Sequence, residues 1–210
     1  DGESAAGAHI SAGVYTITGG LGGLGLRAAV LLQERGAGRI VLASRSGQVV
    51  RDGQGLSAQL QLLEHAAAVI ACDNASLFDS TALSHSATLA RGILHAAGVG
   101  DKGLLLDLAG HRMYWMVATK ASAAYHLHTS TACTPVEWRV LFSSVGSGLG
   151  NVGQANYAAG NACLDAQALC CRAHGVESCC LQWPLVGGAG MGAAAYAGLA
   201  ERRLAMVGMA

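Results

Sequence analysis

The sequence VYTITGGLGGLG, residues 14–25, decides the fold of this chain. Its first five residues, Val14–Thr18, alternate β-branched and aromatic side chains as a strand does. Glycines then crowd positions 19–25. Beyond them, apolar residues recur at the spacing of a helix that ends near Gly36, namely Leu24, Ala28, Leu31 and Leu32. The stretch therefore predicts a strand, a glycine loop and a helix.

This order of elements favours a phosphate-binding site. Because glycine has no Cβ atom, an anion can lie against backbone N–H groups while the positive end of the helix macrodipole faces it. We therefore expect a dinucleotide pyrophosphate to bind at residues 19–25. A flexible glycine-rich hairpin is the alternative.

The second predicted strand, residues 39–43, ends at the polar residues Ser44, Arg45 and Ser46. At this place a dinucleotide site carries either an acid for the ribose 2′-hydroxyl or a base for a 2′-phosphate. No carboxylate follows until Asp52, so Arg45 favours NADP over NAD. In the alternative, Arg45 is a solvated surface charge.

The next segments continue the alternation of helices and strands. Residues 56–65 have helical spacing, and a third strand, residues 68–72, ends at Asp73 and Asn74. These two side chains either reach an adenine edge or cap the next helix. A fourth strand, residues 92–98, ends in small residues, as expected where backbone lies against a nicotinamide ribose.

Residues 108–128 are predicted to form one long helix with Lys120 near its middle. His126 and His128 are two apart and point to different faces, so we expect no metal site there. Alternating strands and helices predict an α/β fold, a Rossmann-type doubly wound parallel sheet with flanking helices.

Residues 138–161, WRVLFSSVGSGLGNVGQANYAAGN, resemble a strand, a glycine-rich turn and a helix of small residues. Helical spacing puts Tyr157 and Asn161 on one helix face, above the strand end that holds Ser143 and Ser144. This pattern indicates a catalytic cluster at the carboxyl edge of the sheet. In the alternative, the tyrosine is part of the core.

Composition excludes several classes of protein. The 210 residues include 13 basic and 13 acidic ones, so no net charge favours nucleic acid or an anionic membrane as partner. The seven cysteines show no C-x-x-C spacing, which indicates buried thiols in a reducing compartment. Two long uncharged stretches, 140–164 and 178–200, are too rich in polar residues and glycine for a membrane span.

The chain begins with Asp1 and shows no secretory signal, so we expect a piece of a longer protein. Residues 1–12 are expected to be a linker remnant, and residues 13–210 one domain.

Taken together and in order, these residues resemble the ketoreductase domain of modular polyketide synthases, a complex-type short-chain dehydrogenase similar to the ketoreductase of animal fatty acid synthase. The resemblance covers about residues 13–192. The matching motifs are residues 18–25, Ser44-Arg45, Cys72-Asp73, His95-Ala96-Ala97-Gly98-Val99, Lys120, Phe142-Ser143-Ser144 and Gln154-Ala155-Asn156-Tyr157-Ala158-Ala159-Gly160-Asn161.

The resemblance implies a role for each matched position. Tyr157 would be the proton donor, Ser144 would hold the substrate carbonyl, and Lys120 and Asn161 would support them. In this family the lysine and asparagine stand exchanged relative to ordinary short-chain dehydrogenases. NADPH would contact Thr18, Gly19, Gly20, Leu21, Gly22, Gly23, Leu24, Ser44, Arg45, Cys72, Asp73, Asn74, His95, Ala96, Ala97, Gly98, Lys120, Tyr157, Pro184 and Leu185.

The implied activity is NADPH-dependent reduction of a β-ketoacyl thioester to the β-hydroxyacyl thioester. The substrate would be tethered by phosphopantetheine to an acyl carrier protein, among neighbouring polyketide synthase domains in the cytoplasm. The alternatives are a catalytically silent structural module, a fatty acid synthase-type reductase and a free-standing short-chain dehydrogenase.

The sequence also departs from the family pattern. The loop that often reads Leu-Asp-Asp is Gly100-Asp101-Lys102, and Leu149 stands where a tryptophan marks the opposite product handedness, so the stereochemistry stays open. The interval 72–95 is short, which puts one flanking helix in doubt and would expose an apolar sheet face. Residues 185–205 resemble the start of a substrate lid, and we expect the domain to be truncated after it.

Overall fold

The computed structural model describes residues 9–50, 54–87, 90–186 and 208–209. Within these residues, six strands form one sheet in the order β3-β2-β1-β4-β5-β6, and all its paired strands are parallel. The chain therefore winds outward from β1 in both directions, which confirms the doubly wound Rossmann-type sheet. The strands are β1 (Val14–Thr18), β2 (Arg39–Ser44), β3 (Ala67–Ala71), β4 (Ala90–His95), β5 (Trp138–Ser144) and β6 (Ser178–Trp183).

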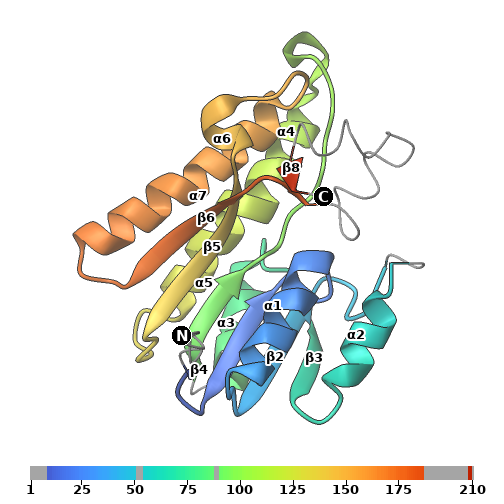
Figure 1. Cartoon of the computed structure of the whole chain (residues 1–210). Coiled ribbons are helices and arrows are strands. Elements are labelled where there is room, and N and C mark those ends of the chain that lie inside the picture. The colour runs from blue at the N-terminus through green and yellow to red at the C-terminus, as the bar shows by residue number, and fades with distance from the viewer. Residues whose placement is uncertain (1–8, 51–53, 88–89, 187–207, 210) are drawn as a thin grey trace, which may run out of the picture.

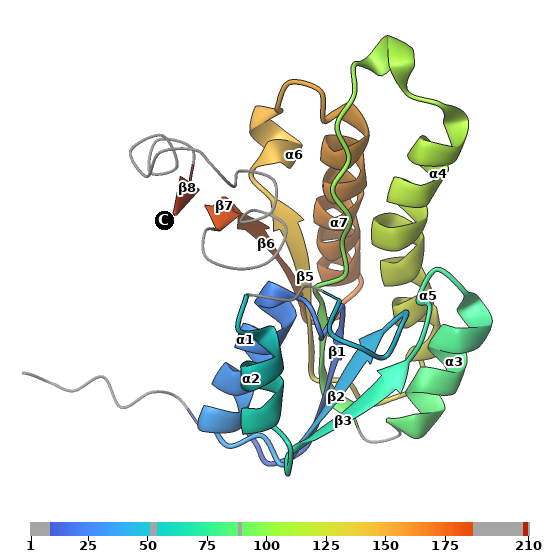
Figure 2. The ribbon, with the colours of Figure 1, turned by 90° about the vertical axis from the view of Figure 1, so that its right-hand side faces the viewer.

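Helices cover both faces of the sheet (Figures 1 and 2). On one face lie α1 (Gly23–Glu34) and α2 (Leu56–Leu62). The other face carries α3 (Leu77–Ser86), α5 (Ala123–Ser130) and α7 (Ala155–Ala173). The remaining helical elements are η1 (Leu105–Asp107), α4 (Gly110–Val117), η2 (Ala118–Ser122) and α6 (Gly146–Leu149).

The main core lies between α1 and the sheet, and it corrects the predicted helix face. Leu26, Ala29 and Leu32 are the α1 side chains buried there, whereas Leu31 is 50% exposed. The helix is rotated this way because Gly25 packs against backbone: a Cβ atom on it would lie 2.4 Å from the Gly19 carbonyl oxygen. The close packing of Gly25 on Gly19 therefore determines which face of α1 is buried, and the spacing of the apolar residues does not.

The short interval 72–95 still contains its flanking helix. Ser76 caps the N-terminus of α3 by accepting a hydrogen bond from the Asp79 backbone N–H. Leu83 and Ala87 pack with Leu127 of α5 in a core cluster. The doubt about this helix was therefore wrong. The strands on either side run over residues 67–71 and 90–95, so Ala96–Gly98 lies beyond β4 and not within it.

The predicted long helix begins at Gly110, and three consecutive segments, α4, η2 and α5, carry it to Ser130. Its middle segment, η2, is a π-helical turn that contains Lys120. The sequence pattern did not predict this turn. Such single turns are frequent at functional sites because they displace one side chain from the regular helical spacing.

The lead-in is attached to the domain where the structure describes it. The Ile10 N–H donates to the Arg35 carbonyl, and the Tyr15 hydroxyl donates to the Ser11 carbonyl. At the other end, β7 (Leu185–Val186) pairs with β8 (Gly208–Met209). Most of the predicted lid, residues 187–205, lies outside the described residues.

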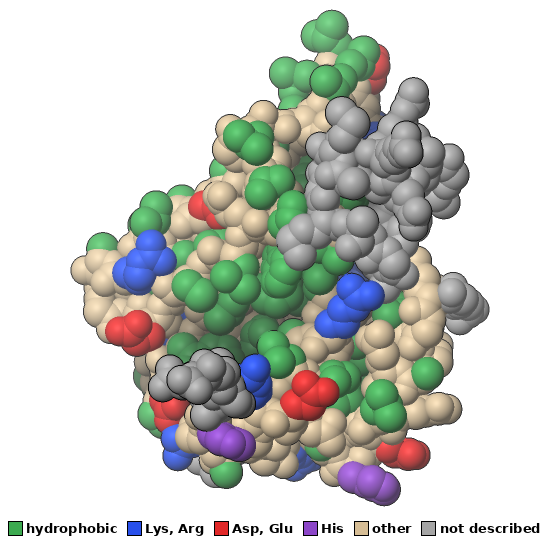
Figure 3. Space-filling view, viewed as in Figure 1, with side chains coloured by type: hydrophobic (Ala, Val, Ile, Leu, Met, Phe, Trp, Pro, Cys, Tyr) green, Lys and Arg blue, Asp and Glu red, His purple; other side chains and the backbone are tan. Residues whose placement is uncertain are grey.

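Hydrophobic side chains gather in a hollow over β5 and β6, beside α1 (Figure 3). Leu181 is 41% exposed, and Val140 and Trp183 are half-buried. An incompletely covered apolar face therefore exists, although it lies on the side of α1 and not beneath α3.

None of the helices among the described residues is both long enough and apolar enough to span a membrane.

Candidate functional site

The turn between β1 and α1 depends on glycine. Gly19 has a φ of 67°, and a Cβ atom there would lie 2.5 Å from the Ala97 backbone. The Ala96 N–H donates to the Thr18 carbonyl, which joins this turn to the end of β4. The structure thus brings the predicted cofactor residues 18–25 and 95–98 together at the carboxyl edge of the sheet.

The N-terminus of α1 has the properties of an anion-binding site. Its N-cap is Gly22, no side chain caps it, and its first turn contains no acidic residue. Backbone N–H groups at this end are therefore free of side-chain acceptors. Leu21 is buried in the core and Leu24 is half-buried against it, so these two residues support the loop by packing.

The end of β2 places Ser44 and Arg45 at the same edge of the sheet. The Ser44 hydroxyl is buried and has no hydrogen-bond partner among the described residues. Arg45 is exposed, which suits either a bound phosphate or a solvated charge.

Cys72, Asp73 and Asn74 all make local contacts beyond β3. The Cys72 thiol is buried against α3, and burial, followed by the charges of Asp79 and Asp73, raises its pKa to about 11. The Asp73 carboxylate accepts from the Ala75 N–H, and the buried Asn74 amide donates to the Ser80 hydroxyl. Both polar side chains thus organise the start of α3, although Ser76 is the cap itself.

His95 ends β4 and is fully buried. Its Nδ1 lies 2.7 Å from the Thr18 hydroxyl oxygen. Burial, with a contribution from the Lys120 charge, lowers the pKa of His95 to about 3. The imidazole is therefore neutral at physiological pH and links the glycine turn to the neighbourhood of Lys120.

Lys120 is a buried cation with a 3% exposed side chain. Its Nζ donates to the Phe142 carbonyl at 2.9 Å and lies 5.8 Å from the centroid of the Tyr157 ring. Burial lowers the pKa of Lys120 to about 8, and its interactions with Cys180 and then Asp165 act in the opposite direction. The residue that its helix pattern alone did not single out therefore lies beside the predicted proton donor.

Tyr157 and Asn161 lie on one face of α7, as predicted. The Asn161 amide donates to the Tyr157 carbonyl at 2.8 Å, and the Asn161 carbonyl accepts from the Ser143 hydroxyl. The Asn161 side-chain oxygen is buried without a partner among the described residues. Ser144 ends β5, and its hydroxyl accepts from the Gly146 N–H. The predicted catalytic residues thus come from β5, η2 and α7.

Gly160 allows η2 to lie this close to α7. A Cβ atom on Gly160 would come within 3.3 Å of Met116 Cγ and 3.5 Å of Lys120 Cβ. The small residue between Tyr157 and Asn161 therefore has a packing role that the sequence analysis did not assign.

The sequence analysis also missed a charged cluster around Asp101. The Asp101 carboxylate accepts from the Arg112 guanidinium and, at 2.6 Å, from the Asn156 amide. Hydrogen bonds from Arg112 and then Asn156 outweigh burial and lower the pKa of Asp101. Asn156 is fully buried and accepts from the Tyr157 N–H, so the cluster fixes the start of α7. Its members lie 11 and 55 positions from Asp101, and only the fold brings them together.

The last predicted cofactor residues follow β6. Trp183 packs against Phe142 with ring centroids 5.4 Å apart, and half-buried Pro184 and Leu185 come directly after it.

The two histidines of α5 face different neighbours: His126 contacts the Asn74 carbonyl, and His128 lies 3.8 Å from the Cys171 sulfur.

A family model described as the KR domain matches residues 13–188 of this chain. The polyketide synthase GfsB of Streptomyces halstedii is 40% identical over 196 residues, which cover 90% of this chain and 4% of that protein. The 6-methylsalicylic acid synthase of Penicillium patulum is 35% identical, over 86% of this chain and 11% of that protein. The chain therefore spans a small fraction of the length of these relatives.

Solved structures give the same result. An A1-type ketoreductase has a TM-score of 0.82 and 34% identity, covering 94% of this chain and 42% of its own. The first ketoreductase of the tylosin polyketide synthase has a TM-score of 0.80 and 34% identity, covering 96% and 44%. The chain thus belongs to the KR family, the ketoreductase domains of polyketide synthases.

Proposed function

We propose that this chain reduces a β-ketoacyl thioester to the β-hydroxyacyl thioester with NADPH. The observation that carries the proposal is the buried Lys120 ammonium beside the Tyr157 ring, with Asn161 on the same helix face. Together with Ser144, these residues supply a hydroxyl, a phenol, an amide and a cation at one sheet edge.

The described residues fit NADPH. The uncapped N-terminus of α1 and the glycine turn, in which a side chain on Gly19 would collide with Ala97, suit a pyrophosphate. Arg45 is positioned at the end of β2, where it would bind a 2′-phosphate. The segment 95–98, Pro184 and Leu185 would border the nicotinamide half, while Cys72, Asp73 and Asn74 would border the adenine.

Bound NADPH would supply the hydride for the β-carbon of the substrate. The chain's own residues manage the charge that develops on the carbonyl oxygen. Hydrogen bonds from Ser144 and Tyr157 would stabilise that oxygen as it becomes negative, and Tyr157 would then give it a proton. The nearby Lys120 cation would stabilise the negative charge that develops on Tyr157 as it gives up this proton.

The proposed substrate is carried by an acyl carrier protein, among other domains of a polyketide synthase. The relatives support this setting, since this chain matches 4% and 11% of two much longer synthases. Seven free cysteines suit the reducing cytoplasm in which we place the protein.

The test compares the whole chain with Tyr157→Phe in an assay of NADPH oxidation by a β-ketoacyl thioester surrogate. We expect kcat to fall by about 10²- to 10⁴-fold in the variant, the usual effect of removing a general acid. Equal activity of the two proteins would show that Tyr157 is not the proton donor.

A catalytically silent module is the second candidate, and the partly uncovered sheet face near Leu181 is the observation that favours it. It predicts a folded chain without NADPH binding. Fluorescence titration with NADPH separates the two candidates before any turnover is measured.

A further inference from the structure

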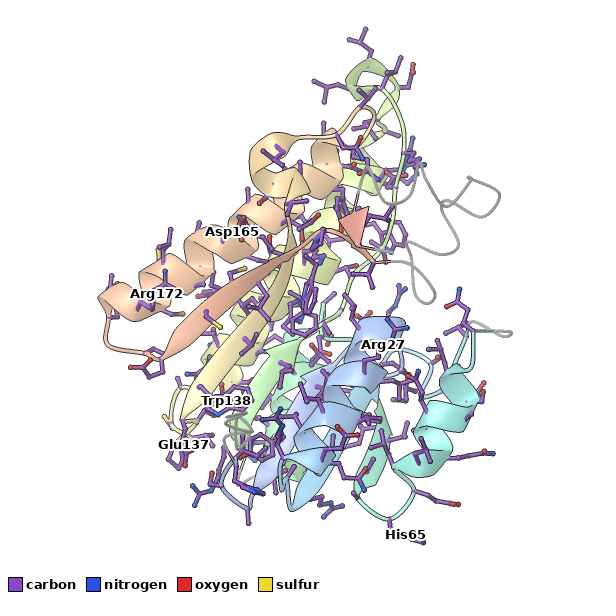
Figure 4. The ribbon with its side chains drawn as sticks, viewed as in Figure 1. Arg27, His65, Glu137, Trp138, Asp165 and Arg172 are labelled. Atoms are coloured by element: carbon purple, nitrogen blue, oxygen red, sulfur yellow. The ribbon has the colours of Figure 1, made fainter. Side chains whose placement is uncertain are left out.

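A half-buried carboxylate, Asp165, follows the catalytic residues on α7 and has no part in the chemistry described so far. It follows Tyr157 and Asn161 on α7 at intervals of eight and four residues, so helical spacing puts it on the same face. Figure 4 shows it on α7, beside α6 and β6. It is therefore the third polar residue on the face that carries the proton donor.

The Asp165 carboxylate joins three elements. Its Oδ2 accepts from the Ser147 hydroxyl at 2.6 Å and from the Gln182 amide at 2.8 Å. The Gln182 amide also donates to the Ser147 hydroxyl, which closes a triangle between α6, α7 and β6. Ser147 is three residues beyond Ser144, so this triangle holds the turn from which the substrate-binding hydroxyl projects.

The other oxygen of Asp165, Oδ1, is buried without a hydrogen-bond partner among the described residues. Burial raises the pKa of this carboxyl, but hydrogen bonds from Cys180, Ser147 and Gln182 outweigh burial and lower it. Asp165 is thus an anion at neutral pH, and one of its two oxygens is buried. Taking part of an anion out of water is costly unless an opposite charge lies near it.

Lys120 is the buried cation nearest to this face of α7 in the described chain: it lies 5.8 Å from the Tyr157 ring, and its β-carbon is 3.5 Å from where a side chain on Gly160 would begin. The titratable groups that interact with its charge are His95 on β4, Cys180 on β6 and Asp165 on α7. His95 is neutral because its pKa is about 3, and the Cys180 thiol is protonated because burial and the Asp165 contacts raise its pKa to about 12. Asp165 is therefore the ionised carboxylate that acts on Lys120.

We propose that Asp165 is a positioning residue for the reductase site: its charge keeps Lys120 protonated, and its hydrogen bonds hold the Ser144 turn against α7. The inference rests on the proposed function for its kinetic readout. Asp165 touches neither substrate nor cofactor in this scheme and acts through Lys120 and Ser147.

The kinetic test measures kcat against pH for the whole chain and for Asp165→Asn, with the β-ketoacyl thioester surrogate. Because the negative charge raises the pKa of Lys120, its removal moves the alkaline fall in kcat to lower pH, by about one unit. At pH 7 kcat falls by about twofold, because the protonated fraction of Lys120 drops from about nine-tenths to about half, with KM for NADPH unchanged. An unchanged alkaline limb in a folded Asp165→Asn variant would overturn the electrostatic role.

Gln182→Ala and Ser147→Ala are the matched controls, because each removes one hydrogen bond to Asp165, together with the bond between Gln182 and Ser147, and leaves the carboxylate charge. For both variants we expect a lower kcat than in the parent, while the alkaline fall in kcat occurs at the same pH as in the parent. Parent-like kcat in both variants would overturn the holding role. In Asp165→Glu, which keeps the negative charge, kcat should fall at the same alkaline pH as in the parent.

A second measurement does not depend on catalysis. Urea unfolding compares Asp165→Asn in the parent with the same change in a Lys120→Met background, where the paired cation is absent. We expect the midpoint to fall less in the second background, or folding to be rescued there if Asp165→Asn alone does not fold. Equal losses would contradict the pairing. A parent chain without activity would refute the proposed function and leave this comparison intact.

Discussion

Two buried cations lie along β5, and they differ in what surrounds them. Lys120 reaches the Phe142 carbonyl near the carboxyl end of the strand and is 3% exposed. Arg139 belongs to the amino end of the strand, which begins at Trp138 (labelled in Figure 4), and is 9% exposed. Both side chains lie on the face of the sheet that carries α5 and α7, but they lie at opposite ends of β5.

The partners of Arg139 are neutral. Its guanidinium donates to the carbonyl and hydroxyl of Thr131, and its Nε has no partner among the described residues. Burial lowers the pKa of Arg139, as it does for Lys120. Burial, then the Arg139 charge, lowers the pKa of neighbouring His128.

Lys120 instead faces a phenol and is acted on by an ionised carboxylate. Burial of a cation is thus not a sign of catalysis by itself, since both Lys120 and Arg139 are buried among the described residues. What distinguishes the proposed catalytic position is the hydroxyl-bearing ring beside it, on which the cation can act. The same substitution at each of the two cations should therefore have different effects.

The largest expected difference is in turnover. Lys120→Met should lower kcat by about 10²- to 10⁴-fold, because it removes the cation that would stabilise the charge developing on Tyr157 during proton transfer. Arg139→Met should keep kcat within about twofold, because roughly 13 Å of strand separates its position from Ser143. Steady-state NADPH oxidation measures kcat for both variants. A similar loss of kcat in the two would contradict the different roles of Lys120 and Arg139.

A smaller effect is expected in the pH dependence of kcat. With the pKa of Lys120 lowered to about 8, the cation is lost as pH rises through that value. Activity of the parent at pH 9 should therefore be about a tenth of its plateau. Arg139→Met should show the same alkaline limb. A limb that moves with Arg139 would show that the two cations are coupled.

The smallest effect is on stability. Arg139 has neutral partners and an unpaired Nε, so its desolvation is poorly compensated. We expect Arg139→Met to raise the free energy of unfolding by about 1 kcal/mol, because buried charges are often replaced by apolar residues without loss. Urea denaturation at pH 7 measures this. A loss of stability would mean that the Thr131 contacts anchor β5 more strongly than this account allows.

The arrangement of the six-stranded sheet was predictable because most of its strands and the glycine turn have local sequence signals. The glycines between β1 and α1 and the short apolar strands specify a parallel sheet without reference to distant residues. The buried face of α1 was mispredicted because a backbone contact between Gly25 and Gly19 sets the rotation of the helix. The π-helical turn at Lys120 likewise leaves no trace in apolar spacing.

The site was only partly predictable. Helical spacing placed Tyr157 and Asn161 together, whereas Lys120 gained a role through family resemblance and then through its contact with the Tyr157 ring. Asp101 and Asp165 were missed because their partners come from other elements of the fold. A carboxylate in a sequence shows neither its burial nor its partner.

One measurement tests the proposed reduction most directly. The whole chain is incubated with a β-ketoacyl thioester and NADPH that carries deuterium at both positions of nicotinamide C4, and the product is examined by mass spectrometry. The account predicts a β-hydroxyacyl thioester with one deuterium on its β-carbon, formed by the parent and lost in Tyr157→Phe. A folded chain that binds NADPH and yields no deuterated product would contradict it.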